Sequence, residues 1–133
     1  MARALALGLI AGGGGAALAQ AVDALGQMRP GEYQIHEVGG ANAPRTLCVT
    51  DTKRLLQLAH GNAGCTFRTI TAGAEAATVR YVCPGAGNGT TDVTVQGKTG
   101  LRLHTQGVQR GAPFDTVYQA QFNGPCRAGL AAR

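Results

Sequence analysis

The segment CTFRTITAGAEAATVRYVC, from Cys65 to Cys83, is the clearest indication of the fold. Two runs rich in β-branched and aromatic residues flank the small, turn-forming segment TAGAEAA, which is typical of a β-hairpin. Antiparallel pairing about Ala74 places Phe67 opposite Tyr81 and Cys65 opposite Cys83. This register gathers hydrophobic side chains on the face that carries both cysteines, and it brings the two sulfurs within disulfide range.

The four cysteines predict two disulfides. An even count in a small exported domain favours disulfides, although the count alone permits three pairings. The hairpin pairs Cys65 with Cys83, and elimination then leaves Cys48 for Cys126. A zinc site drawing on Cys48, His60, Cys65 and Cys83 is the weaker alternative, because the spacing lacks any CxxC cluster. A thiol redox enzyme would also need a CxxC motif. We therefore predict no metal and no cofactor.

The N-terminal stretch MARALALGLIAGGGGAALAQA has the layout of a secretory signal peptide. Arg3 precedes an apolar segment, and Ala17-Leu18-Ala19 supplies small residues for cleavage near Ala19. The apolar segment is too short and too rich in glycine for a membrane span. The expected organisation is a signal peptide over 1–19, a loosely packed lead-in over 20–28, one β domain over 29–126 and a flexible tail over 127–133.

Alternating hydrophobic residues separated by glycine-rich turns predict a mainly β fold. The short connection GKT sets Val95 opposite Leu101 and Val93 opposite Leu103. We expect a single antiparallel, strongly curled sheet, either a half-open barrel or a sandwich. Its predicted strands are 31–38, 44–49, 65–71, 77–83, 90–96, 100–106 and 115–123.

One short α-helix is expected at about 51–60, where Leu55, Leu58 and Ala59 form an amphipathic stripe. Thr50 or Asp51 would cap its start and Gly61 would end it. His60 would then lie in the last turn, where a partial positive charge suits the helix dipole.

The charge pattern gives no sign of a nucleic-acid-binding protein. The formal net charge is +5, but the basic residues are scattered singly apart from Lys53-Arg54, and they do not alternate with aromatics. The glycine motifs at 84–91 and 97–100 are each followed by a predicted strand rather than a helix, which excludes a dinucleotide or phosphate loop. Asn88-Gly89-Thr90 matches a glycosylation acceptor, yet a turn explains it equally well.

No catalytic residue can be assigned from the sequence. His36, His60 and His104 are widely spaced, and none lies beside a serine or cysteine in a catalytic pattern. His36-Glu37 and Asp92 would have to meet in space to form a site, whereas His104 is expected to point to solvent.

The chain resembles the bacterial family labelled domain of unknown function 3617. The resemblance rests on the order of its pieces rather than on one motif: GQMRPGEYQIHEV at 26–38, RTLCVTD at 45–51, Gly64-Cys65, Tyr81-Val82-Cys83 and Gly124-Pro125-Cys126. The chain departs from the family at Glu32-Tyr33, where the family has an aliphatic residue and Trp. The resemblance implies an exported, periplasmic, disulfide-bonded β domain of Gram-negative bacteria, and it implies no activity.

These features favour a periplasmic binding or interaction module over an enzyme. The expected partner is a small apolar or envelope-derived ligand, held by the curled sheet, or an envelope protein. The alternative is a periplasmic hydrolase whose catalytic groups are dispersed in sequence.

Overall fold

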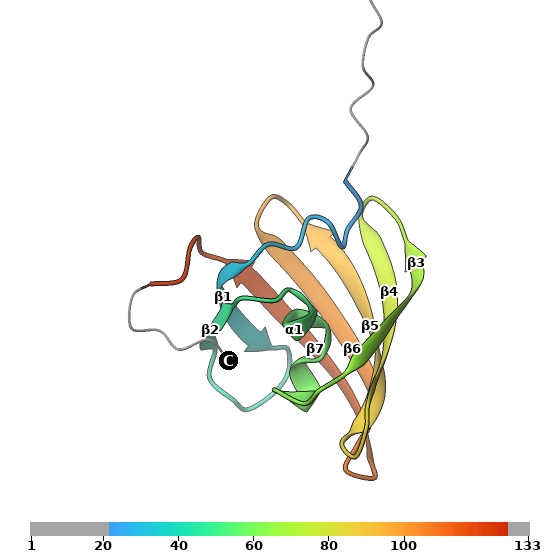
Figure 1. The fold of residues 1–133 in the computed structure, drawn as a ribbon. Coiled ribbons are helices and arrows are strands. Elements are labelled where there is room, and N and C mark those ends of the chain that lie inside the picture. Colours follow the sequence, from blue (N-terminus) through green and yellow to red (C-terminus); the bar gives the residue numbers. More distant parts are fainter. Residues whose placement is uncertain (1–21, 128–133) are drawn as a thin grey trace, which may run out of the picture.

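Residues 22–127 are described by a computed structural model, and they form one antiparallel sheet of seven strands (Figure 1). The spatial order is β2-β1-β7-β6-β5-β4-β3, so β2 and β3 are the two edges of a sheet that does not close. This confirms the predicted mainly β, curled, half-open sheet. The strands are β1 (Gly31–Glu37), β2 (Arg45–Val49), β3 (Thr66–Ala72), β4 (Ala76–Cys83), β5 (Gly87–Gln96), β6 (Gly100–Gln109) and β7 (Ala112–Phe122).

The β3–β4 hairpin has the predicted register over its first half. Phe67 pairs with Tyr81, but the register shifts between Thr69 and Thr71, so that a β-bulge surrounds Ile70. The bulge moves the turn, and the Gly73 N–H closes it by donating to the carbonyl of residue 76 at 2.8 Å. Centring the hairpin on Ala74 throughout was therefore wrong beyond the bulge, because one extra residue on β3 faces β4 there.

The β5–β6 hairpin confirms the predicted pairs Val95 with Leu101 and Val93 with Leu103. Strand β5 begins at Gly87, however, earlier than predicted. A Cβ atom added to Gly89 would lie 2.4 Å from the Tyr81 hydroxyl oxygen. The glycine therefore makes room for the tyrosine across the sheet, and this run belongs to a strand rather than to a turn.

The predicted helix over 51–60 is divided into α1 (Lys53–Leu56) and a 3₁₀ turn, η1 (Leu58–His60). Gln57 breaks the helix with φ −119° and ψ 31°. Its buried amide donates to the carbonyls of Gly61 and Ala63 at 2.9 and 2.8 Å. A single continuous helix was wrong because these hydrogen bonds hold the chain in a turn at Gln57. The N-cap residue is Thr52, without a side-chain cap, and the predicted cap Asp51 instead accepts from the Lys53 N–H at 3.0 Å in a turn just before α1.

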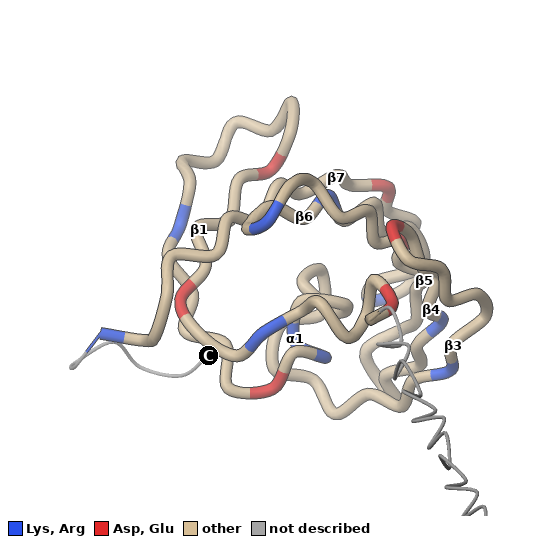
Figure 2. Tube along the Cα trace, turned by 90° about the horizontal axis from the view of Figure 1, so that it is seen from above, with Lys and Arg blue, Asp and Glu red and all other residues tan. Residues whose placement is uncertain are grey.

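This helical segment fills the concave side of the sheet, where Figure 2 shows α1 inside the ring of strands. Leu55, Leu56 and Leu58 are all buried there. They pack with inward side chains of both halves of the sheet, including Tyr33, Ile35, Leu47, Val79, Val93, Leu101, Leu103 and Ala120. Each buried leucine contributes about 1.5–3 kcal/mol, so the packing of the segment matters more than its helix propensity.

Buried hydrogen bonds attach the helical segment to the sheet. The Thr91 hydroxyl donates to the Leu56 carbonyl at 2.6 Å, and the His60 ring lies 3.0 Å from both the Tyr81 hydroxyl and the Val108 carbonyl. Because a carbonyl only accepts, His60 Nε2 donates to Val108, and in the neutral ring Nδ1 accepts from Tyr81. His60 therefore anchors the segment from inside the core, in addition to ending it.

Both disulfides have the predicted pairing. Cys65 and Cys83 join β4 to the start of β3 with a Cα separation of 4.1 Å, whereas Cys48 and Cys126 are 5.5 Å apart. The short separation at the hairpin is that of a pair whose backbones do not hydrogen-bond to each other.

The segment before β1 is more tightly packed than predicted. Ala24 is fully buried and Met28 is 7% exposed. The Ala24 N–H donates to the Gly73 carbonyl at 2.8 Å, and the Gln27 amide donates to the Ala74 carbonyl at 2.7 Å. A loosely packed lead-in was therefore wrong for 22–28, which runs from the β3–β4 turn to β1 (Figure 1). The predicted signal peptide and residues 128–133 of the predicted tail lie outside the described residues.

Candidate functional site

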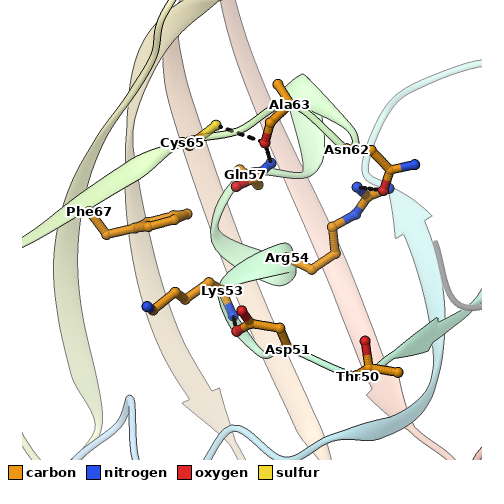
Figure 3. A pocket seen from close by; sticks show the side chains of 9 residues that line it. All are labelled: Thr50, Asp51, Lys53, Arg54, Gln57, Asn62, Ala63, Cys65 and Phe67. Carbon is orange, nitrogen blue, oxygen red and sulfur yellow. Dashed lines mark hydrogen bonds between the residues drawn. The ribbon is translucent and has the colours of Figure 1, made fainter.

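A cleft opens between α1 and β3, in the gap between the two edges of the sheet (Figure 3). It lies where the chain crosses from the edge strand β2, through α1 and η1, to the edge strand β3. Its volume is about 450 Å³. The lining residues are Thr50, Asp51, Lys53, Arg54, Gln57, Asn62, Ala63, Cys65 and Phe67.

Two neighbouring cations give this α1–β3 cleft its character. The Lys53 ammonium lies 5.9 Å from the centre of the Phe67 ring, while the Arg54 guanidinium extends toward Asn62 and donates to its side-chain oxygen (Figure 3). Asp51 is the acidic member of the lining, and its Oδ1 already accepts from the Lys53 backbone N–H. Within residues 22–127, neither cation forms a salt bridge.

Arg54 is held in an unfavourable environment for a cation. Its Nε atom is buried and has no hydrogen-bond partner among the described residues. Burial, and secondarily the charge of Arg45, lower the pKa of the Arg54 guanidinium. Arginine still carries its charge at neutral pH, so a buried donor and an unbalanced positive charge remain. An anion in the cleft would balance that charge.

Two other hollows each bring one cation and one acid together. One, of about 570 Å³, lies on the outer face and includes Arg80 and Asp115. Asp115 already accepts from His104 at 2.6 Å. The other, of about 370 Å³, brings the opposite charges of Glu37 and Arg45 to a single lining. The α1–β3 cleft has two cations beside one acid in its lining, so it is the better candidate for recognising an anion.

The acid and base residues singled out from the sequence do not meet. His36 pairs across the sheet with Gln119 and is exposed, whereas its neighbour Glu37 alternates to the other face and lines the 370 Å³ hollow. Asp92 accepts from the Thr78 hydroxyl at 2.6 Å. These three residues therefore do not share one cleft.

His104 and the glycine motif at 97–100 have structural roles. His104 lies on the outer face, as expected, and its hydrogen bond to Asp115 holds it there. Residues 97–99 make the β5–β6 connection, with Gly97 at φ 63°. In the described part of the chain, no group of three or more His, Cys, Asp or Glu side chains is arranged to hold a metal ion. Over the same residues, no helix is long and apolar enough to cross a membrane.

The sequence analysis did not predict the cleft, although one feature of the sequence pointed to it. Lys53-Arg54 is the one place where two basic residues are adjacent. Their position at the start of a short helix indicated that two cations would share one end of it. The contribution of Phe67 and Asn62 depends on how the edges of the sheet come together, and no local pattern carries that information.

Comparison with known proteins found no match: no family model, no curated protein and no solved structure resembles the chain closely enough to be assigned. The resemblance to domain of unknown function 3617 therefore stays a prediction.

Proposed function

We propose that this protein is an exported, periplasmic binding module that holds an anionic group of an envelope ligand or envelope protein in the α1–β3 cleft. The observation that carries the proposal is that Lys53 and Arg54 line one cleft and that neither forms a salt bridge within residues 22–127. A carboxylate or phosphate offers acceptors for the guanidinium and neutralises the local charge.

The disulfides support the compartment assigned by this proposal. All four cysteines are paired, so every cysteine of the chain is used in a bond that persists in oxidising compartments. Together with the signal peptide predicted over 1–19, this favours the periplasm over the cytoplasm.

The packing of the core favours a polar or charged ligand over an apolar one inside the sheet. Leu103 and Val93 are fully buried, and the helical segment occupies the concave side that an apolar ligand would need. The hollows around the core are lined by mixtures of polar and charged residues. A hydrolase with a dispersed site is the weaker candidate, since His36, Glu37 and Asp92 lie apart.

Site-specific photo-crosslinking in a Gram-negative host tests this function. The full chain carries p-benzoylphenylalanine either at Phe67, in the cleft, or at Thr94, exposed on the outer face of β5. The protein should be recovered from the periplasmic fraction. A defined adduct should form from position 67 and disappear in the Arg54→Gln background.

The same adduct from both positions, or an adduct unaffected by Arg54→Gln, would contradict recognition in the cleft. Recovery of the chain from the cytoplasm alone would contradict export. Arg68→Gln provides the matched control, because it removes the same charge from an exposed position on β3 outside the cleft lining.

A further inference from the structure

The two edge strands differ in how much of their backbone a partner can reach. On β2, Leu47, Cys48 and Val49 are buried, so much of that edge is covered. On β3, Phe67 is half-buried and every other residue is exposed. Exposed edges are ordinarily protected against pairing by charges, bulges or covering segments. On β3 the protection consists of the bulge at Ile70.

The register identifies the β3 backbone groups that face outward. Cys65 and Cys83 are only 4.1 Å apart at their Cα atoms, as in a pair without mutual backbone hydrogen bonds. Because bonded and non-bonded pairs alternate, Phe67 and Thr69 also face away from β4. Within the described chain, no backbone or side-chain group bonds to their outward N–H and C=O groups.

These outward groups lie beside the α1–β3 cleft. Phe67 lines the cleft with its side chain, and Lys53 lies against its ring. A strand added next to β3 would alternate its side chains between the two faces of the sheet. The residue opposite Phe67 or Thr69 would therefore place its side chain on the cleft face, which Lys53 and Arg54 also line.

The bulge makes the open edge short. Regular pairing on β3 is interrupted between Thr69 and Thr71, so the uninterrupted stretch is short and its backbone hydrogen bonds alone offer little affinity. A partner therefore needs a side chain that the cleft recognises. The apolar Ile70, 52% exposed at the end of this stretch, adds a contact for a neighbouring β-branched residue.

We propose that β3 accepts an extended segment of a partner protein as an additional antiparallel strand, with an acidic side chain of that segment in the α1–β3 cleft. This rests on the proposed function and names the partner as a polypeptide with an acidic residue in an extended, β-branched context. The β3 backbone supplies the hydrogen bonds, and Lys53 and Arg54 select the acidic side chain.

Charge excludes a second copy of the chain as the preferred occupant. If β3 paired with β3 of a second copy, Lys53, Arg54 and Arg68 of both copies would lie at one interface. The chain has a net charge of +5, so self-association also opposes the overall repulsion. An acidic partner gains from the same charges.

Binding of a defined peptide to the full chain, measured by titration calorimetry at low salt, tests the proposal. The probe is the capped pentapeptide Thr-Val-Asp-Val-Thr, compared with its Asp→Asn form. We expect the acidic peptide to bind, and the amide form to bind about fivefold more weakly. Lys53→Gln should remove most of that difference, whereas Arg68→Gln should change the affinity less than about twofold.

Two changes test the strand itself. Thr69→Pro removes an outward N–H from an edge strand, where proline is tolerated. It should lower the affinity for the acidic peptide about tenfold. If this variant does not fold, N-methylation of alternate peptide residues makes the same test on the partner. Methyl groups on the residues facing β3 should abolish binding, and those on the intervening residues should not.

The outcomes separate this proposal from the function on which it rests. If capped aspartate alone binds as tightly as the pentapeptide and Arg54→Gln abolishes both, the cleft binds anions but strand addition is wrong. If Arg68→Gln weakens the peptide as much as Lys53→Gln does, or if the pentapeptide does not bind, strand addition with cleft recognition is overturned. A dimer of the chain alone that Thr69→Pro dissociates would also overturn it, since the edge would then belong to a second copy.

Discussion

The two edges of the sheet are both tied by a disulfide, yet one is covered and the other is accessible. At β2, the closed edge, the Cys48–Cys126 bond ties the strand to the chain end that follows β7. The Glu32 carboxylate, buried beside it, accepts from Arg127 Nε at 2.9 Å. At β3, the open edge, the Cys65–Cys83 bond only joins the strand to its hairpin partner.

This difference shows how a small curled sheet can keep one edge available without losing its fold. The closed edge is bound by contacts between segments far apart in sequence, which stabilise the whole domain. The open edge is stabilised locally, by a hairpin that holds its shape whether or not a partner adds to it.

Removal of the disulfides should destabilise the protein unequally. The Cys48–Cys126 bond closes a sequence separation of 78 residues and the Cys65–Cys83 bond one of 18. In the chain-entropy description these contribute about 4.5 and about 3 kcal/mol. Urea unfolding should therefore show a greater loss for the Cys48→Ser/Cys126→Ser pair than for Cys65→Ser/Cys83→Ser. The reverse order would contradict the assignment of global stabilisation to the closed edge.

Leu55→Ala tests the segment that links the two edges. Leu55 is 1% exposed within the core, so its truncation should cost about 2–5 kcal/mol through lost burial and a cavity. The matched change Val82→Ala, at a side chain 49% exposed on β4, should stay within about 0.5 kcal/mol. Equal losses in urea unfolding would mean that the helical segment does not fill the sheet.

Tyr81→Phe and Tyr33→Phe compare two buried hydroxyls, one on each half of the sheet. The Tyr81 hydroxyl lies 3.0 Å from His60 Nδ1 in the core, so its loss leaves a buried nitrogen unpaired and should cost about 1–3 kcal/mol. The partly buried Tyr33 hydroxyl donates to the carbonyl of the exposed Arg29 at 2.7 Å and accepts from the Arg29 N–H at 3.1 Å. Water can replace both bonds, so Tyr33→Phe should cost about 1 kcal/mol or less by urea unfolding.

Alkaline pH tests the tyrosines together. Burial is the main cause that raises the pKa of Tyr33, Tyr81 and Tyr118, with Glu37 adding to the effect at Tyr118. Because the folded pKa lies above the unfolded value, the contribution of the neutral tyrosines to the free energy of unfolding is complete below about pH 10. That contribution is lost as the pH rises through the folded pKa.

Phenolate absorbance should therefore rise at a higher pH in the folded protein than in the chain unfolded in guanidinium, where the tyrosines titrate at about pH 10. Below that pH, tyrosine ionisation should leave the free energy of unfolding unchanged. Coincident titration curves for the two states would show that the three hydroxyls are accessible to water.

The sequence predicts the parts of the fold that depend on local pairing. Alternation in TTDVTVQ and LRLHTQ sets the β5–β6 register, and the cysteine positions identify the β3–β4 hairpin. The Ile70 bulge and the break at Gln57 were missed, because each depends on contacts with residues outside its own segment. The cleft was missed for a related reason: it forms only where the connection between the two edges passes β3.

The most direct test of the open edge is residue-resolved amide hydrogen exchange on the full chain, with and without the capped pentapeptide Thr-Val-Asp-Val-Thr. In the free protein, the amides of Phe67 and Thr69 should exchange fast while that of Arg68, which faces β4, exchanges slowly. The peptide should slow the exchange of the Phe67 and Thr69 amides and leave the exchange of the Leu47 amide, on the closed edge, unchanged. Protection of Phe67 and Thr69 already in the free protein, or no change at these amides when the peptide is bound, would contradict the account.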